Sequence, residues 1–468
     1  MTAWIAQLLL SLAVLASLPS DIQTITHVLE RTSFGVRPGD VERVQTMGLD
    51  RYIDDQLHPE RVNDAGLDAR LGEFATLRMS SRDIIEEFAR PLEEARKAAA
   101  AAGGDGRPNP EQQRRAATVV QELQQQKVVR AIYGARQLQE VLVDFWFNHF
   151  NVDARKGVDR FMLTSYERDV IRPHVFGKFR DLLEATAKSP AMLFYLDNWM
   201  SADPAGPHVA FAARRFPPRV NAKAPKGLNE NYGRELMELH TLGVDGGYTQ
   251  KDVTEVARAF TGWTIDRPRQ DGAFRFEPRL HDEGKKIVLG HVIDAGGMRD
   301  GEEVLDILAT HPSTARFIAT KLVRHFVSDT PPPPLVDRVA ARFRETGGDL
   351  REVMRTILTS PEFLSPEAYH AKVKTPFEFV VSAVRATDAD VHDARPLVQQ
   401  IAQLGEPLYQ CQPPTGYKDT ADAWVNTGAL VGRMNFGLAL ASNKIRGVVV
   451  SNTTPDGIAL GAPAFQRK

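Results

Sequence analysis

Apolar residues recur at helical spacing along most of this chain, and that period limits the folds open to it. Within residues 40–57, Val41, Val44, Leu49 and Ile53 follow one another at such intervals after a Pro-Gly-Asp start signal. The same period predicts further helices over residues 302–310, 313–327, 335–345, 349–359, 375–387 and 425–441. The chain is therefore predicted to be mainly α-helical.

Residues 274–290 form the only convincing β segment in the sequence. Two short β-prone runs flank the turn-forming tetrapeptide His-Asp-Glu-Gly. We therefore predict a mainly α fold, with a large multi-helix body and one short β-hairpin at about 274–290.

Residues 93–126 are rich in alanine, glutamine and charge, and the breaker Gly-Gly-Asp-Gly-Arg-Pro-Asn-Pro interrupts them. Such a composition offers few large apolar side chains, so that the segment cannot bury much surface. We predict a projecting helical hairpin or a mobile insertion here, with residues 98–112 as its most mobile part.

These breaks suggest five regions along the chain. They are a signal peptide or N-terminal anchor (1–20), an N-terminal helical part (21–92), the low-complexity helical insertion (93–128), a central region that holds the polar clusters (129–300) and a C-terminal helical region (301–468).

Residues 4–18, WIAQLLLSLAVLASL, are nearly all apolar, and Pro19 follows them. The run is shorter than the roughly 20 residues of a membrane span but has the length of a signal-peptide core. An uncleaved anchor or a buried helix is the alternative, because no Lys or Arg precedes the run and the cleavage site is mediocre. We expect a periplasmic or secreted protein with no membrane span beyond this segment.

Charge and cysteine content exclude several classes of protein. The net charge is −2 and the isoelectric point is near 6.7, which argues against nucleic acid as a partner. The basic loop at 201–227 is the one feature that favours binding to nucleic acid. The single cysteine, Cys411, excludes internal disulfides and thiolate-rich metal sites.

The densest polar cluster lies in residues 229–248, NENYGRELMELHTLGVDGGY. On an α-helical wheel Arg234, Glu235 and Glu238 share one face, and the two glutamates are one turn apart. Such a pair could serve as acid and base or hold a cation, with Arg234 as an anion clamp. The alternative is a solvated face stabilised by i,i+4 ion pairs.

His149 ends a strongly apolar helix predicted over residues 136–152. A histidine at the end of a buried stripe is either a core residue with one hydrogen bond or a general base that opens onto a cavity. We therefore predict that His149 shares an internal pocket with Glu235 and Glu238.

His281 and Asp282 lie in the predicted hairpin, and they are candidate metal or substrate ligands. Turn chemistry accounts for the aspartate but not for the histidine. The cofactor stays open, with a divalent metal as the candidate.

Several segments together resemble a large bacterial family known as domain of unknown function 1800. They are RTSFGVRPGDVERV (31–44), FWFNHFNV (145–152), NENYGRELMELHTLGVDGGYTQKDVTEVARAFTGW (229–263), HDEGKK (281–286), HPSTARFIATKLVRHFVSD (311–329) and GEPLYQCQPPTGY (405–417). The resemblance covers residues 27 to about 440. It implies an exported protein, often encoded beside a sulfatase-like protein, and it supplies no settled activity.

Two functions follow as hypotheses. The first is an exported hydrolase or lyase that acts on a polymer or glycan through a buried Glu/His pocket. The second is a non-catalytic envelope protein that binds a sulfatase-like exported partner through the 93–126 segment and the basic loop.

Overall fold

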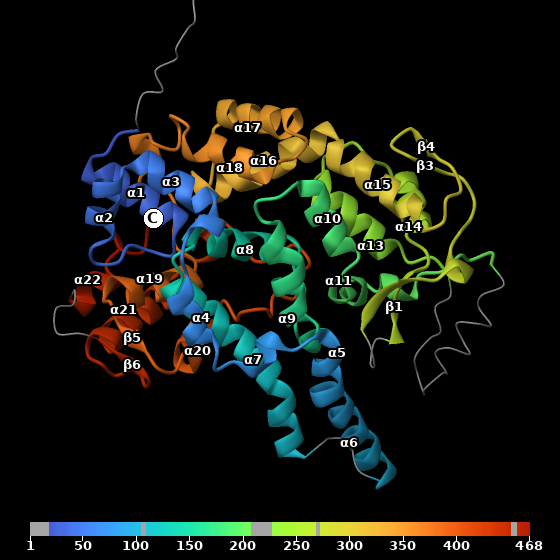
Figure 1. Cartoon of the computed structure of the whole chain (residues 1–468), viewed down its shortest axis with the longest axis horizontal. Coiled ribbons are helices and arrows are strands. Elements are labelled where there is room, and N and C mark those ends of the chain that lie inside the picture. The colour runs from blue at the N-terminus through green and yellow to red at the C-terminus, as the bar shows by residue number, and fades with distance from the viewer. Residues whose placement is uncertain (1–17, 104–108, 207–226, 268–271, 451–455) are drawn as a thin grey trace, which may run out of the picture.

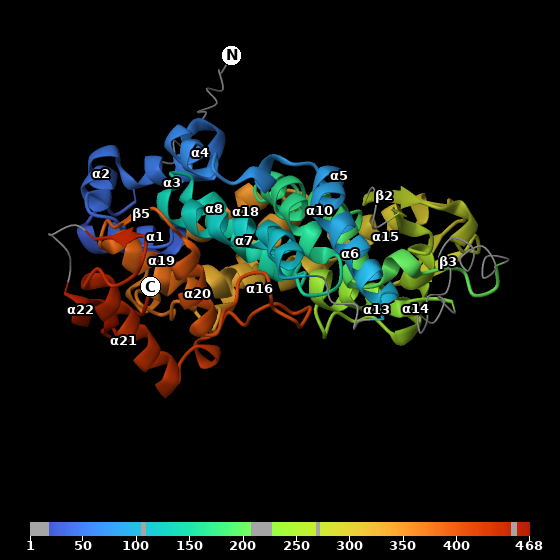
Figure 2. The same cartoon turned by 90° about the horizontal axis from the view of Figure 1, so that it is seen from below.

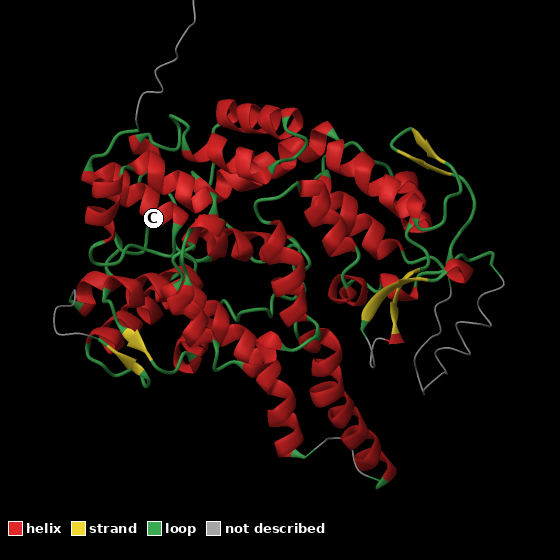
Figure 3. Cartoon of the chain, in the orientation of Figure 1, coloured by secondary structure: helices red, strands yellow, loops and turns green. Residues whose placement is uncertain are grey.

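The chain folds into a long, flattened body of helices, shown in two views in Figures 1 and 2. A computed structural model describes residues 18–103, 109–206, 227–267, 272–450 and 456–468. Within these residues, strands occur only as short pairs at the two ends of the body (Figure 3). The predicted mainly α fold is therefore confirmed.

The longer helices carry the body. They are α1 (Ile22–Thr32), α2 (Asp40–Met47), α3 (Leu49–Leu57), α6 (Arg90–Ala101), α7 (Pro110–Tyr133), α8 (Gln137–His149), α10 (Phe179–Ala187), α14 (Gln250–Ala259), α15 (Arg299–Thr310), α16 (Pro312–Phe326), α17 (Pro333–Glu345), α18 (Leu350–Leu358), α19 (Pro376–Ala386), α20 (Arg395–Gln403) and α21 (Thr427–Ala441). Shorter helices are α4 (Ala65–Leu71), α5 (Ser81–Ile84), α9 (Leu163–Ser165), α11 (Pro190–Tyr195), α13 (Glu230–Glu235) and α22 (Gly457–Gly461).

The predicted helices are present, with one break that the apolar period does not show. Residues 40–57 form two helices, α2 and α3, because Gly48 between them has a φ of 90° and turns the chain. Gly48 donates its backbone N–H to the carbonyl oxygen of Val44 and so closes α2.

Both β-prone runs of the predicted hairpin are strands, but they do not pair with each other. β2 (Ala273–Phe276) pairs antiparallel with β1 (Trp263–Asp266), and β3 (Lys286–Val288) pairs with β4 (His291–Ile293). A third pair, β5 (Asp390–Val391) with β6 (Val448–Val449), lies at the opposite end of the body. The predicted partners were wrong because each run finds a closer partner outside the 274–290 window.

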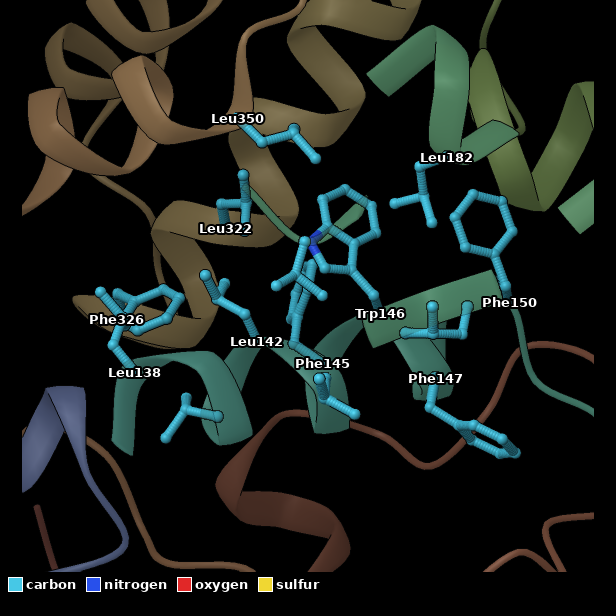
Figure 4. Packing of buried hydrophobic residues seen from close by; sticks show 14 of the residues in the cluster. Leu138, Leu142, Phe145, Trp146, Phe147, Phe150, Leu182, Leu322, Phe326 and Leu350 are labelled. Carbon is cyan, nitrogen blue, oxygen red and sulfur yellow. The ribbon is translucent and has the colours of Figure 1, made fainter. Parts of the chain in front are cut away.

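One continuous apolar core extends from Ile25 to Leu460 and includes side chains from all three predicted helical regions. Helix α8 lies inside it and is buried on most sides. Figure 4 shows Trp146 rising from α8 toward Leu322 and Leu350, whereas Phe147 points to the opposite side. The helix therefore has an apolar neighbour on each flank, and its position is fixed by packing.

The N-terminal helices α1 to α3 and the C-terminal helices α19 to α22 lie at the same end of the body (Figures 1 and 2). Arg385 of α19 is buried and donates to the carbonyl oxygens of Gly35 (2.7 Å) and Ile132 (2.7 Å). His27 of α1 bonds the carbonyl oxygen of Phe363 (2.8 Å). These contacts join α1 and the turn after it to α19 and to the chain that follows α18.

Helix α6 and the first half of α7 project from the body as a hairpin (Figure 1). A small second core, which includes Ile84, Phe88, Leu92 and Val119, fills the base of this hairpin. From Leu123 onward α7 instead belongs to the main core, so that the projecting part ends earlier than predicted.

Some predictions fall outside the described residues. The apolar run at 4–18 lies almost wholly there, as do residues 104–108 of the hairpin connection and residues 207–226 of the basic loop. None of the helices in the described ranges combines the length and apolar composition that a membrane span requires.

Asp159 is fully buried, and neither of its carboxylate oxygens has a hydrogen-bond partner among the described residues. Burial therefore raises the pKa of Asp159 well above its usual range. The folded state holds a proton that the unfolded chain has already released, so stability falls as the pH rises from about 4.

We predict that Asp159→Asn raises the free energy of unfolding by about 2 kcal/mol at pH 8 and changes it little at pH 4. Urea unfolding across this pH range measures the difference. Asp68→Asn, at an exposed position, is the control and should leave the pH dependence as it is. If the free energy of unfolding depends on pH equally in the Asp159 variant and in wild type, the pKa of Asp159 is not raised.

Candidate functional site

The predicted glutamate face lies where a helix changes its winding. Asn229 caps α13 by accepting from the backbone N–H of Asn231 (2.9 Å), and from Leu236 to Thr241 the chain continues as a π-helix. A π-helix closes i→i+5 hydrogen bonds, so side chains beyond residue 236 depart from the α-helical wheel. The wheel therefore cannot place Glu238 and His240 correctly.

Glu235 and Glu238 are half-buried rather than enclosed. Burial raises the pKa of Glu235, and the neighbouring charge of Glu238 raises it further. Tyr248 donates its hydroxyl to Glu238 (3.3 Å), and Arg234 donates to the side-chain oxygen of Gln250 (2.7 Å). The carboxylates are thus neighbours, and both Arg234 and Glu238 have partners from the α14 side.

His149 is buried at the end of α8, as the apolar stripe predicts. Its Nε2 lies 3.1 Å from the carbonyl oxygen of His240. Because a carbonyl only accepts, Nε2 carries the proton, and burial keeps the pKa of His149 well below its usual range. The ring is therefore neutral, and its Nδ1 presents a lone pair that has no partner among the described residues.

The structure does not bring His149 and the two glutamates into one pocket. His149 lines a cavity of about 330 Å³, whereas Glu235, Glu238 and Arg234 are absent from the lining of that cavity. The predicted shared pocket was wrong because the π-helix directs the backbone of His240, and not the carboxylates, toward His149. Catalytic roles for Arg234, Glu235 and Glu238 stay a prediction.

His281 and Asp282 belong to a separate buried network. The Nδ1 of His281 lies 2.8 Å from the carbonyl oxygen of Thr261, and its Nε2 lies 3.1 Å from Asp300. Asp282 accepts two bonds from Arg258 (2.7 and 3.0 Å). Protein partners thus occupy the atoms that a metal would need, and the described residues contain no group of three or more His, Cys, Asp or Glu that could hold a metal ion.

The cavity lies among α7, α8, α16, the start of α19 and an irregular stretch that we call the 406–420 segment. Its charged and titratable lining consists of Lys127, Asp144, His149, Lys321, Arg324, His325, Glu378, Glu406, Tyr409, Cys411, Tyr417, Lys418 and Asp419. A cavity of this size that contains convergent polar groups is the preferred place for a ligand.

Two asparagines at the end of α8 hold the 406–420 segment over the cavity. Asn148 donates to the carbonyl oxygen of Tyr417 (2.9 Å) and accepts from its backbone N–H (2.7 Å). Asn151 donates to the carbonyl oxygens of Cys411 and Pro413 (both 2.9 Å). Each amide thus replaces the backbone partners that an irregular segment lacks.

Gly416 allows this close approach. Its φ is 72°, and a Cβ atom there would lie 2.2 Å from the backbone oxygen of Asn148. A larger residue would therefore both strain the backbone and separate the segment from α8.

Glu406 is the most perturbed acid of the cavity wall. Burial raises the pKa of this carboxyl to about 8, and the nearby charge of Asp144 adds to the effect. Its Oε2 accepts from the backbone N–H of Phe377 (2.7 Å). At neutral pH Glu406 is therefore mainly a neutral acid, able to donate a proton.

His325 and Asp419 form an oriented pair in the same lining. The Nδ1 of His325 lies 2.9 Å from the Oδ2 of Asp419. Burial acts to raise the pKa of Asp419, but His325 and Lys372 outweigh it and hold that pKa well below its usual range. The ionised carboxylate fixes the ring, and the buried Nε2 of His325 has no partner among the described residues.

Lys127 and Asp144 form an ion pair in the wall (2.6 Å between Nζ and Oδ1). Lys321 has no such partner in the part of the chain that the structure describes, and burial lowers the pKa of its ammonium to about 8. The cavity therefore contains paired and unpaired cations side by side.

Sequence reasoning found His149 but missed Glu406, His325, Asp419 and Lys321. A signal was present, because the 311–329 and 405–417 blocks that contain three of these residues are part of the family resemblance. Isolated acidic and basic residues carry no periodic pattern, so spacing alone could not select them.

The structure thus defines a mainly α-helical protein with a buried, charged cavity among its central helices. The chain belongs to the family described as "Protein of unknown function (DUF1800)", whose model matches residues 27–464. This match confirms the resemblance seen in the sequence. Searches of the curated proteins and of the solved structures found no match.

We predict that Asn148→Ala lowers the free energy of unfolding by about 2 kcal/mol, because the backbone groups of Tyr417 lose their partners. Hydrogen exchange should rise in residues 411–417. Asn435→Ala, at an exposed position of α21, is the control. Unchanged hydrogen exchange in the Asn148 variant would show that the bonds from Asn148 to Tyr417 do not hold the 406–420 segment.

The raised pKa of Glu406 predicts a pH-dependent stability. The folded state retains a proton above the ordinary glutamate range, so wild-type stability falls between about pH 4.5 and pH 8. Glu406→Gln removes this fall and should be more stable than wild type by about 3 kcal/mol at pH 8, with little difference at pH 4.5. If the free energies of unfolding of wild type and Glu406→Gln differ by the same amount at every pH from 4.5 to 8, the raised pKa of Glu406 is refuted.

Proposed function

We propose that the chain is an enzyme, a hydrolase or lyase of a polymer or glycan, and that the cavity is its active site. One observation carries the proposal: the same cavity is lined by an oriented histidine, His325, and a neutral carboxylic acid, Glu406. A histidine with a free ring nitrogen and a carboxylic acid that holds its proton are the parts that general acid–base catalysis needs.

His325 is suited to the role of base. Asp419 accepts the proton of Nδ1, which leaves Nε2 with the lone pair whenever the ring is neutral. A carboxylate that orients a histidine in this way also stabilises the charged ring after proton transfer. Glu406 would then protonate the leaving group, since its raised pKa keeps the proton available near neutral pH.

The lining suits a hydroxylated substrate. Nδ1 of His149 can accept a hydroxyl proton, and the hydroxyl group of Thr415 adds a further polar contact. A sugar ring presents several hydroxyls at once, which agrees with the glycan hypothesis from the sequence.

We also propose that the protein is exported, on the basis of the apolar run at 4–18. The alternative function, a non-catalytic envelope protein with a sulfatase-like partner, has its support in the projecting α6–α7 hairpin rather than in the cavity. The two functions therefore use different surfaces and can be separated by point variants.

We predict that Glu406→Gln and His325→Gln each lower turnover of a cleaved glycan by about 10²- to 10⁴-fold while the fold is kept. Product release from a panel of soluble polysaccharides measures the rate, and circular dichroism checks the fold. Glu345→Gln, at a position whose side chain is 67% exposed, is the matched control.

Glu238→Gln tests the rival site from the sequence. Loss of activity in this variant, with full activity in Glu406→Gln, would move the chemistry to the half-buried glutamate pair. Absence of turnover on every polysaccharide, with binding of a sulfatase-like protein abolished by changes in the hairpin, would favour the non-catalytic function.

A further inference from the structure

Most charged side chains around the cavity already have an oppositely charged partner. Lys127 pairs with Asp144 (2.6 Å), Lys372 with Asp419 (3.2 Å), and Lys418 at the rim with Asp422 (3.7 Å). These pairs satisfy one another and leave little net attraction for a ligand.

Lys321 and Arg324 differ from the other cations of the lining. Among the described residues, no carboxylate oxygen lies within 4 Å of either side chain, and Arg324 makes one long bond, 3.4 Å, to the carbonyl oxygen of Asp329. The two residues are three apart on α16, so they lie on one face of that helix. Asp419 attracts Lys321 from a longer distance, but two adjacent cations that are partly withdrawn from water and touch no carboxylate are costly for the protein alone.

We infer that Lys321 and Arg324 bind the carboxylate of a hydroxylated substrate, such as a sugar acid. The inference rests on the proposed function and names the chemical class of its substrate. Arg and Lys donors bind a carboxylate through short charge-assisted hydrogen bonds, and a guanidinium can bind it with two.

The charge of the whole lining favours a single negative charge. Lys127, Lys321, Arg324 and Lys418 face the carboxylates of Asp144, Glu378 and Asp419, and Glu406 is mainly neutral at pH 7. One positive charge is therefore in excess. A carboxylate balances it, whereas a doubly charged phosphate would leave an uncompensated charge near the acidic side chains.

The two histidines of the lining supply the remaining specificity. His149 presents Nδ1 and His325 presents Nε2, both buried and without partners among the described residues. Neutral imidazole nitrogens accept protons from hydroxyl groups but repel a carboxylate. The ligand should therefore place its acid group at Lys321 and Arg324 and its hydroxyls at the histidines.

Isothermal titration of the full chain with D-glucuronate, D-galacturonate, D-glucose and inorganic phosphate at pH 7 tests the inference. We expect at least one of the two sugar acids to bind and to bind more tightly than glucose or phosphate. Lys321→Met and Arg324→Gln should each weaken that binding at least tenfold, because each removes a charge-assisted bond. Arg316→Gln is the matched control, since Arg316 lies on the same helix, is exposed and pairs with Asp337.

The result separates this inference from the proposed function. Glu406→Gln should keep sugar-acid binding while it loses turnover. A wild-type chain that binds a sugar acid but cleaves none of the polysaccharides would overturn the enzyme and leave the carboxylate site standing. No binding of either sugar acid, tighter binding of phosphate, or equal binding by the Lys321 and Arg316 variants would overturn the carboxylate site.

Discussion

The attachment of the 406–420 segment to the end of α8 is the interaction on which the cavity depends. Asn148 and Asn151 hold four backbone groups of that segment, and Gly416 lets it approach within a distance that no side chain would permit. Helix α8 can serve as the support because its apolar side chains fix it within the core. Glu406, Tyr417 and Asp419 then take positions that a free loop could not hold, since an irregular chain has no ladder of its own hydrogen bonds.

The polar and charged groups buried around the cavity lower the stability of the fold. Their presence therefore indicates a functional site. Glu406 is buried as a neutral acid, and Lys321 and one ring nitrogen each of His149 and His325 have no hydrogen-bond partner among the described residues. Each of these groups costs free energy that an apolar lining would avoid. A neighbouring network pairs its buried charges closely, as in the bonds of Arg172 to Glu140 (2.6 and 3.0 Å). The Arg172–Glu140 network is satisfied, whereas the groups of the cavity lining are not. This difference distinguishes a functional site from a structural cluster.

The sequence predicted the helices well because the apolar period that specifies them is local, as in α16 and α19. It failed on strand pairing, because β2 finds its partner in Trp263–Asp266, a four-residue strand directly after a helix with no period of its own. It also failed on the site. His149 was identified from its apolar stripe, whereas Glu406 and Asp419 lie in an irregular segment where only the tertiary fold decides burial. The pKa of Glu406 follows from that burial and so has no local signal.

The segment at 229–248 still acts on the cavity, although through its backbone. The π-helix from Leu236 to Thr241 buries the ring of His240 and presents its carbonyl oxygen to Nε2 of His149. This bond fixes the tautomer of His149 and leaves Nδ1 as an acceptor without a partner among the described residues. A regular α-helix over the same residues would turn that carbonyl elsewhere, and His149 would lose the partner that sets its proton. The contribution of this segment to the cavity is therefore one hydrogen bond, which leaves the neutral ring of His149 with Nδ1 as a free acceptor.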